Sequence, residues 1–304
     1  MGKENGVIVV GSRGSQLALW QARHISAALE ALGVKTRLEI IKTTGDKIQD
    51  VPLAQVGGKG LFTKEIEEAL LAGDIDLAVH SLKDMPTGLP EGLTLAAIPP
   101  REDARDALIG KRLCELKAGD RVGTSSLRRA AQLHALGRGF IIENLRGNVD
   151  TRLRKLDEGL FASIVLAAAG LRRLGWADRI CEVLDPEIMC PAVGQGALAI
   201  ETRDDRGAAQ RIAQNLDHAE TRASVTAERA LLRTLEGGCQ VPIGAHAMIQ
   251  GAQLSLRAIV SSPDGQRIIR RSTTGPVEEA ERLGREAGEQ LLAQGAKAIL
   301  KGLA

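Results

Sequence analysis

Aromatic side chains are scarce in this sequence: they make up 2% of its 304 residues, and tyrosine is absent. Proteins that bind single-stranded nucleic acid stack bases on aromatic faces, so this class is disfavoured. An excess of positive charge is also missing, because 40 Lys and Arg are balanced by 38 Asp and Glu, for a net charge of +2. That balance argues against a protein whose main task is to coat nucleic acid. We therefore expect no nucleic-acid partner.

Long apolar segments are lacking as well. The longest run, from Ile164 to Ala169, is far shorter than the ~20 residues that span a bilayer. The first six residues contain no apolar core of a signal peptide, and Gly6 breaks the myristoylation pattern. These features predict a cytoplasmic protein without a membrane partner.

Cysteine is sparse and scattered, at positions 114, 181, 190 and 239. No C-x-x-C pair occurs and no histidine cluster accompanies the thiols, so no metal site is expected. In a reducing compartment such thiols usually behave as buried small hydrophobes, and we predict this for Cys114, Cys181 and Cys190. Cys239 differs, because two glycines precede it and permit close approach of another group. The residues alone leave both a covalent tether and a structural thiol open.

Strand-like and helix-like patterns alternate over most of the chain. Up to the pair Pro99-Pro100, strands are expected at 7–10, 36–41, 75–79 and 93–98, and helices at 17–32 and 62–72. The pattern then restarts, with strands ending at 123, 143 and 167 and helices at 127–136 and 149–160. The chain is expected to be helical from Ala199 to about Leu235. Three strands at 244–249, 253–260 and 266–271 and a helix at 277–293 complete it.

This order of elements predicts an α/β fold. Strands that alternate with helices favour parallel sheets, so the first two parts are expected to be doubly wound lobes. The last part is expected to be a small α+β domain with a three-stranded antiparallel sheet and helices.

Two glycine-rich strings invite a nucleotide-binding interpretation. Residues 194–199 match the G-x-G-x-x-A dinucleotide pattern, but they do not follow a clear strand and the residues after them look extended. A nicotinamide dehydrogenase would need this string to open a helix. Residues 57–60 resemble part of a P-loop without its hydroxyl residue, yet they bring Lys59 to the start of a helix, which suits an anion.

Basic residues recur at the loops that follow the expected strands. Such loops lie at the carboxyl ends of parallel strands, where open α/β sheets bind ligands, and arginine grips carboxylates in a bidentate way. The residues concerned are Arg13, Arg128, Arg129, Arg146, Arg152 and Arg173. They predict a crevice for a polyanion. The alternative is surface charge paired with neighbouring acids, which we expect for Arg154 and Lys155.

An acidic residue, Asp84, lies among these bases in the string His80-Ser81-Leu82-Lys83-Asp84. Cationic neighbours favour its ionised form, which could stabilise a positive intermediate or transfer a proton. The alternative is that Asp84 caps the turn at Met85-Pro86.

Six strings taken together resemble the porphobilinogen deaminase family, also called hydroxymethylbilane synthase, of tetrapyrrole synthesis. They lie at residues 53–62, 78–84, 123–129, 145–152, 191–197 and 236–242 and are spread over nearly the whole chain. The resemblance implies a transferase with a covalently bound dipyrromethane primer. Four porphobilinogen molecules are condensed onto this primer head to tail with release of ammonia. The linear tetrapyrrole hydroxymethylbilane is then removed by hydrolysis.

The resemblance also implies a domain division. Residues 1–99 and 200–216 would form the first lobe and residues 100–199 the second, both similar to periplasmic solute-binding lobes. Residues 217–304 would form the C-terminal domain that carries the cofactor cysteine. We expect a monomer. The alternative function is a non-catalytic solute-binding module for a polycarboxylate, which would give Cys239 no role.

Residue roles follow from the resemblance position by position. Cys239 would hold the dipyrromethane through a thioether, and Asp84 would be the catalytic acid. The other cofactor-binding residues would be Lys83, Thr124, Ser126, Arg128, Arg129 and Arg146. The substrate-binding residues would be Arg13, Ser15, Lys59, Phe62, Arg152, Arg173 and Gln195. Gln55 departs from the pattern, because relatives often have lysine there.

Overall fold

The computed structural model describes residues 6–47, 60–236 and 241–301. These residues form two compact units. The first comprises the chain up to Arg101 together with Ala197–Arg222, and the second comprises Glu102–Gly196 together with the chain from Ala223 onward. The chain therefore leaves the first unit and returns to it later.

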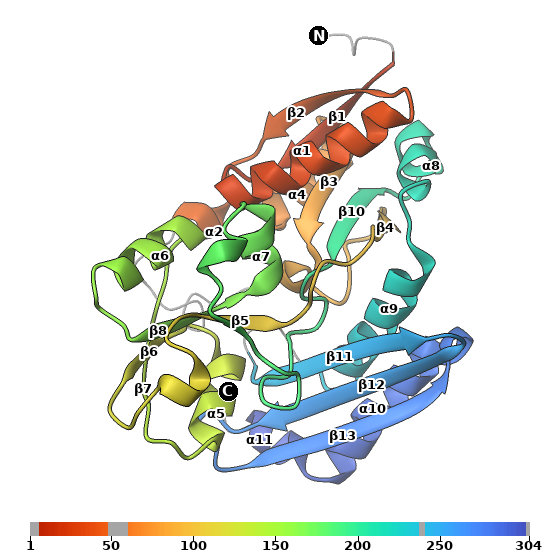
Figure 1. Cartoon of the computed structure of the whole chain (residues 1–304). Helices are drawn as coiled ribbons and strands as arrows, with labels where there is room; N and C mark the ends of the chain where they lie inside the picture. Colours follow the sequence, from red (N-terminus) through yellow and green to blue (C-terminus); the bar gives the residue numbers. More distant parts are fainter. Residues whose placement is uncertain (1–5, 48–59, 237–240, 302–304) are drawn as a thin grey trace. The chain divides into compact units, whose positions relative to one another are not determined.

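The first unit is built on a five-stranded sheet with the strand order β2-β1-β3-β10-β4 (Figure 1). Its elements are β1 (Val7–Ser12), α1 (Gln16–Ala31), β2 (Lys35–Ile40), α2 (Thr44–Lys47), α4 (Lys64–Ala72), β3 (Leu77–Ser81), the 3₁₀ turn η1 (Leu82–Asp84), β4 (Leu93–Ala97), β10 (Leu198–Arg203) and α8 (Ala208–Gln214). Strands β1, β2 and β3 are parallel, whereas β10 runs antiparallel to both β3 and β4. The carboxyl ends of β1 and β3 consequently lie at the same edge of the sheet.

Helices cover both faces of this sheet. Successive residues of a strand point to opposite sides, so one strand supplies side chains to both faces. Val10 packs with α1 and α8 on one face, and its neighbour Val9 packs with α4 on the other. Local sequence explains where the helices begin and end. The Ser15 hydroxyl accepts a hydrogen bond from the backbone N–H of Ala18 at the start of α1, and Gly73 ends α4 with a positive φ of 77°.

The second unit contains another five-stranded sheet, ordered β7-β6-β8-β5-β9. Its elements are β5 (Asp106–Gly110), η2 (Leu113–Glu115), β6 (Arg121–Gly123), α5 (Leu127–Ala135), β7 (Ile141–Glu143), α6 (Val149–Asp157), β8 (Ser163–Ala167), α7 (Ala168–Arg173), η3 (Ala177–Arg179) and β9 (Glu182–Val183). Strands β6, β7 and β8 are parallel, and β5 is antiparallel to β8. Helices α6 and α7 cover one face and α5 covers the other.

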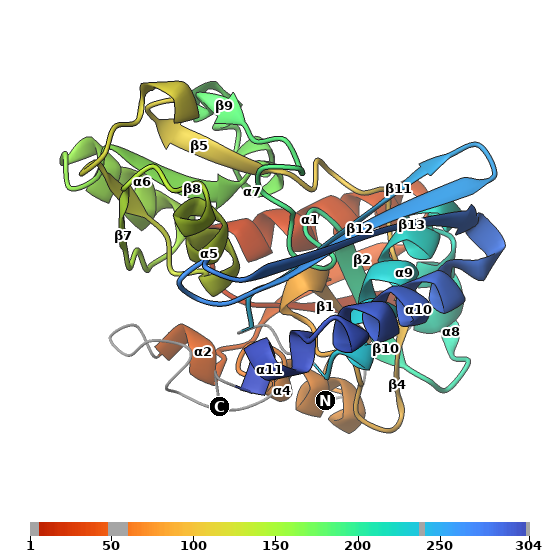
Figure 2. The same ribbon diagram turned by 90° about the horizontal axis from the view of Figure 1, so that it is seen from below.

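The same unit includes a three-stranded antiparallel sheet ordered β11-β12-β13, with helices packed on one side of it (Figure 2). The elements are α9 (Ala219–Thr234), which begins in the first unit, β11 (Ile243–Gln250), β12 (Gln253–Ser261), β13 (Ile268–Pro276), η4 (Val277–Glu279), α10 (Ala280–Ala293) and α11 (Ala296–Lys301). Their apolar side chains form one buried cluster. The predicted fold class, two α/β sheets and a small α+β part, is confirmed.

Several sequence expectations were wrong in detail. The chain is not helical from Ala199, because residues 198–203 form strand β10 between two others, and α8 and α9 follow separately. Neither large sheet is wholly parallel, and strand β5 was not predicted. Two of the three thiols expected to be buried are not, since Cys114 is exposed and Cys181 is half-buried.

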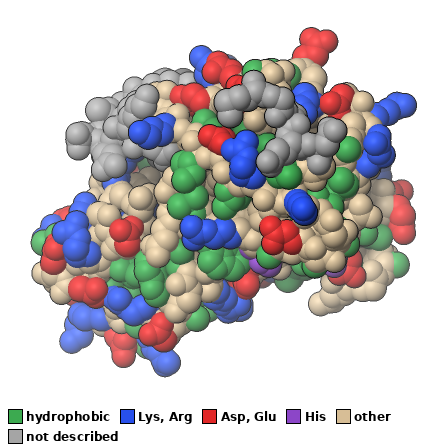
Figure 3. All heavy atoms as spheres, turned by 90° about the horizontal axis from the view of Figure 1, so that it is seen from above, with side chains coloured by type: hydrophobic (Ala, Val, Ile, Leu, Met, Phe, Trp, Pro, Cys, Tyr) green, Lys and Arg blue, Asp and Glu red, His purple; other side chains and the backbone are tan. Residues whose placement is uncertain are grey.

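The surface agrees with the even charge balance. On the face drawn in Figure 3, Lys and Arg side chains are interspersed with Asp and Glu. Within the ranges 6–47, 60–236 and 241–301, no helix is long and apolar enough to span a membrane.

Candidate functional site

Residues at the carboxyl ends of β1 and β3 line a small pocket in the first unit. Its volume is about 70 Å³, and its lining includes Arg13, Ser15, Phe62, His80 and Asp84. The guanidinium carbon of Arg13 lies 4.1 Å from the centre of the Phe62 ring, a cation–π contact that fixes the charge at the pocket wall. The pocket thus brings together four sequence-predicted site residues.

Turn η1 follows β3 directly and carries both Lys83 and Asp84, which are half-buried. The turn is held by the backbone N–H of Leu82, which donates to the carbonyl of Ala197 over 3.0 Å. The Asp84 carboxyl therefore belongs to a segment that the sheet itself positions. A carboxylate and a guanidinium in one pocket can bind a molecule that carries both an ammonium group and carboxylates.

His80, which lines this pocket, belongs to a buried polar cluster that the sequence did not reveal. His80 Nε2 is 3.0 Å from Glu201 Oε2, and the two residues are 5% and 0% exposed. Glu67 on α4 is close to both, and burial together with the nearby Glu201 raises its pKa. The cluster joins β3, β10 and α4 and borders the pocket that Asp84 lines.

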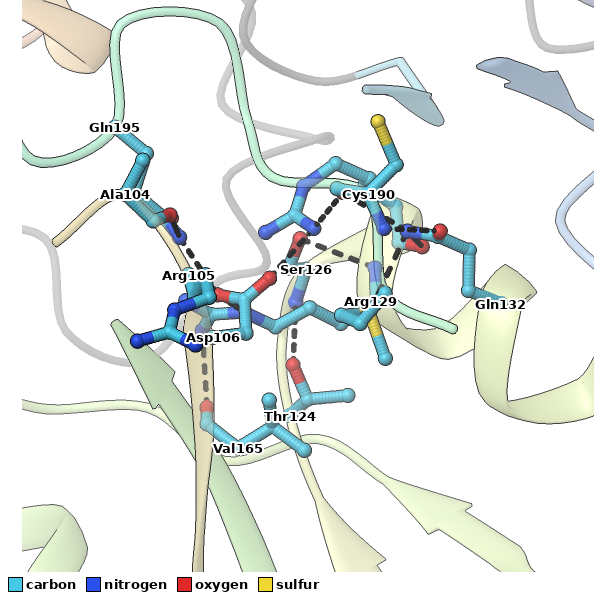
Figure 4. A network of polar contacts seen from close by, with 12 residues as sticks. Ala104, Arg105, Asp106, Thr124, Ser126, Arg129, Gln132, Val165, Cys190 and Gln195 are labelled. Carbon is cyan, nitrogen blue, oxygen red and sulfur yellow. Dashed lines mark hydrogen bonds and ion pairs between the residues drawn. The ribbon is translucent and has the colours of Figure 1, made fainter. Parts of the chain in front are cut away.

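In the second unit, two predicted ligand-binding arginines share one buried counter-ion, Asp106, which Figure 4 shows together with Arg129. Arg128 Nη1 donates to Asp106 Oδ2 over 2.7 Å, and Arg129 donates from Nε and Nη2 to Oδ1 over 3.0 and 2.7 Å. Asp106 is 0% exposed, and the arginines are 4% and 6% exposed. Burial opposes ionisation of Asp106, but the two guanidiniums outweigh it and lower its pKa below the ordinary range.

The network extends to the loop that precedes β10. The Gln195 side chain donates to Asp106 Oδ1 over 2.9 Å and to the carbonyl of Ala104 over 2.7 Å. Arg128 Nη1 also donates to the carbonyl of Cys190 over 2.6 Å. Burial raises the pKa of the Cys190 thiol to about 12, so this thiol is not a nucleophile near neutral pH.

The hydroxyls predicted to bind ligand take part in local structure. Ser126 caps the N-terminus of α5, and its hydroxyl accepts a hydrogen bond from the backbone N–H of Arg129 over 3.4 Å. The Thr124 hydroxyl accepts from the backbone N–H of Ser126 over 3.2 Å. The backbone N–H of Thr124 in turn donates to the carbonyl of Glu143, which holds the ends of β6 and β7 together. These contacts fix the loop from which Arg128 and Arg129 project.

The other predicted basic residues of this unit come after β7 and β8: Arg146 lies in the loop before α6, Arg152 in α6 and Arg173 at the end of α7. Nη1 of Arg146 is buried and has no hydrogen-bond partner among the described residues. Arg152 Nε donates to the carbonyl of Gly147 over 2.8 Å. Arg173 Nη2 donates to the carbonyl of Gly196 over 2.6 Å, and burial lowers the Arg173 pKa to about 10. Arg154, expected to be ordinary surface charge, is exposed and paired with Glu158.

Some sequence hypotheses are resolved differently or not at all. Residues 194–196 lie in a turn that leads into β10, so the glycine string does not open a helix and the dinucleotide interpretation fails. Gln55, Lys59 and Cys239 lie outside the described residues.

Comparison with known proteins identifies the family. A family model described as porphobilinogen deaminase, dipyromethane cofactor binding domain, matches residues 8–211, and the porphobilinogen deaminase C-terminal domain matches residues 223–293. The chain belongs to the porphobilinogen deaminase family. The porphobilinogen deaminase of Syntrophobacter fumaroxidans is 54% identical over 300 residues, which cover 97% of each chain. That of Trichlorobacter lovleyi is 52% identical over 296 residues, covering 96% of this chain and 95% of the relative.

Among solved structures, the methionine-binding protein MetQ matches with a TM-score of 0.45 and 17% identity, covering 69% of this chain and 89% of MetQ.

Membership of the porphobilinogen deaminase family supports the enzymatic interpretation of the sequence and not the alternative of a non-catalytic solute-binding module. The cofactor-binding domain of that family covers both large sheets and therefore every described residue of the candidate site.

Two residues that contribute to this arrangement were missed at the sequence level. Asp106 begins the unpredicted strand β5, and the apolar run 107–109 after it was the available signal. Glu228 on α9 is 0% exposed and accepts hydrogen bonds from the backbone N–H groups of Gly194 and Ala247 over 2.7 and 2.8 Å. A single buried glutamate in a helix carries no sequence signal that separates it from a solvated one.

Proposed function

We propose that this porphobilinogen deaminase condenses four porphobilinogen molecules head to tail, with loss of ammonia, onto a dipyrromethane held by Cys239, and then releases the linear tetrapyrrole hydroxymethylbilane by hydrolysis. The proposal is carried by one observation: Asp84 and Arg13 line the same pocket. Porphobilinogen presents an aminomethyl group and two carboxylates, so it needs an anion beside its leaving ammonium and a cation beside its acetate or propionate.

The second unit offers groups that suit the cofactor. Arg146 has a buried guanidinium nitrogen without a partner among the described residues, an arrangement that favours an anionic ligand. Arg128 has guanidinium donors, Nε and Nη2, that no residue in the described part of the chain engages. When bound, dipyrromethane supplies the pyrrole end to which the first substrate is joined. The residues proposed to form its binding site are Lys83, Thr124, Ser126, Arg128, Arg129 and Arg146, with Cys239 as the covalent attachment.

The proposed roles of the chain's residues follow from their charges. As ammonia leaves, positive charge develops on the substrate pyrrole, and a preorganised Asp84 carboxylate stabilises that charge where it forms. The proposed substrate-binding residues neutralise or hydrogen-bond the pyrrole carboxylates. They are Arg13, Ser15, Lys59, Phe62, Arg152, Arg173 and Gln195.

We infer the domain organisation and setting in the same way. The proposed first lobe is 1–99 with 200–216, the second is 100–199, and 217–304 is the domain that carries the cofactor. The partner is the small molecule porphobilinogen, and the enzyme is proposed to act as a cytoplasmic monomer without nucleic acid.

Intact mass spectrometry tests the covalent cofactor. Wild-type protein is expected to exceed its sequence mass by one two-pyrrole unit, and Cys239→Ala is expected to lack the excess and the activity. Cys114→Ala is the matched control, because Cys114 is an exposed thiol elsewhere in the chain, and it is expected to keep both. A fully active wild type at the bare sequence mass would contradict the proposal.

A further inference from the structure

The two arginines that share Asp106 are bonded differently. Arg129 uses all three guanidinium nitrogens: Nε and Nη2 donate to Asp106, and Nη1 donates to the carbonyl of Val165 over 2.9 Å. Arg128 makes both of its bonds, to Asp106 and to the carbonyl of Cys190, through the single nitrogen Nη1. Its Nε and Nη2 make no hydrogen bond within the described part of the chain.

We propose that Asp106 is a positioning residue that gives the two arginines unequal roles. Asp106 takes up the charge of Arg129, which then serves the fold, and it fixes Arg128 so that Nε and Nη2 face a carboxylate of the pyrrole ligand. This inference rests on the proposed function, because that function supplies a polycarboxylate ligand. It goes beyond it by assigning a role to Asp106 and by separating two residues that share one sequence motif.

The charges in the network make the proposal specific. Two guanidiniums and one carboxylate leave a single net positive charge. The edge of Arg128 formed by Nε and Nη2 is the part of the network that no described residue engages. Asp106→Asn leaves two unneutralised cations in a buried place and a single acceptor oxygen for which Arg128 and Arg129 compete, so Arg128 is no longer oriented. If charge alone mattered, this variant would bind carboxylates better. If orientation matters, it binds them worse.

Paired substitutions separate these possibilities. Both Asp106→Asn/Arg129→Gln and Asp106→Asn/Arg128→Gln keep the wild-type net charge, so each is the control for the other. Replacing a buried ion pair by neutral groups of similar shape is often tolerated, whereas breaking it by removing one partner is costly. In the first double variant the amide oxygen at position 106 can accept from Arg128 Nη1 without competition from Arg129, so this variant is expected to regain most of what Asp106→Asn loses. The second double variant lacks Arg128 and is not expected to regain it.

The measurement is the fraction of purified protein that carries the two-pyrrole mass, taken together with the melting midpoint of each variant. Asp106→Asn is expected to load about tenfold less cofactor than wild type, since a bidentate charged contact has lost its geometry. Asp106→Asn/Arg129→Gln is expected to load within about threefold of wild type, and Asp106→Asn/Arg128→Gln at the level of Asp106→Asn or below. Equal loading of the two double variants, or wild-type loading of Asp106→Asn, would overturn the inference.

Lysine variants keep the test decisive if the Asn variants fold poorly. Arg128→Lys and Arg129→Lys retain charge, and the proposal expects the former to lower loading several-fold more than the latter at comparable melting midpoints. The reverse order would refute it. Asp103→Asn is the matched control, because Asp103 is also paired with arginines, Arg105 and Arg172, but lies outside the network. The wild-type arm alone tests the proposed function, since absence of the mass excess there contradicts that function and not the unequal roles.

Discussion

Removing the buried carboxyl of Glu228 is expected to cost the second unit much of its stability. Each side-chain oxygen accepts one backbone N–H, from Gly194 at 2.7 Å and from Ala247 at 2.8 Å. Hydrogen bonds to a charged group contribute about 1.5–3 kcal/mol each, so Glu228→Ala is expected to lower the free energy of unfolding by roughly 3–6 kcal/mol. For a unit of this size that corresponds to a drop of roughly 6–24 °C in melting midpoint.

Glu228→Gln is expected to fall between wild type and the alanine variant. Its amide keeps one acceptor oxygen, but its NH₂ group meets the second backbone N–H, so about half of the loss is expected. Glu220→Gln is the matched control, because Glu220 lies on the same helix and is exposed. Thermal melts followed by far-UV circular dichroism provide the measurement. If Glu228→Ala melts within 2 °C of wild type, roughly the lower limit set by a loss of 1 kcal/mol, the reasoning from these bonds is refuted.

Three further outcomes are expected. Asp84→Asn should lower kcat by about 10² or more with little change in KM, measured as porphobilinogen consumption. Normal turnover per folded molecule with a lower melting midpoint would instead favour a turn-capping role. Arg129→Leu should strongly lower the melting midpoint because it leaves a buried carboxylate with one partner fewer, whereas the exposed Arg154→Leu should change it by less than about 1 °C. Burial raises the pKa of Glu67 above its ordinary value of 4.5, so the charged form of Glu67 destabilises the fold. Stability is therefore lost as the pH rises above 4.5 and Glu67 ionises in the folded protein. Glu67→Gln should therefore melt higher than wild type at pH 8 and lose this advantage at pH 4; an unchanged difference across that range would contradict the shift.

Local patterns were enough to predict much of the fold. The apolar run from Val7 to Val10 and the apolar spacing after Ser15 each specify an element through their immediate neighbours. Arg13 and Arg128 follow strand ends in the sequence, and the topology rule for parallel strands was sufficient to expect them at sheet edges.

Tertiary pairing was beyond the sequence. β10 pairs with β3 and β4, two strands far earlier in the chain, and no local pattern encodes that register. The pairing of Arg128 and Arg129 with Asp106 was missed for a similar reason. A buried carboxylate and a solvated one look alike in sequence, and only the fold shows that these three charged side chains meet in a buried cluster.

The late return of the chain to the first sheet has a consequence during synthesis. Until residues 198–203 have left the ribosome, β3 and β4 each lack the neighbour that separates them in the finished sheet, and both present unpaired backbone edges. The sheet of the second unit, made from residues 106–183, is complete in sequence before that point. The nascent first unit is therefore open to edge-to-edge association with other chains while the inserted segment can already fold. A chain truncated just before Leu198 should aggregate through these edges, whereas one that ends after Arg203 carries the strand that closes them.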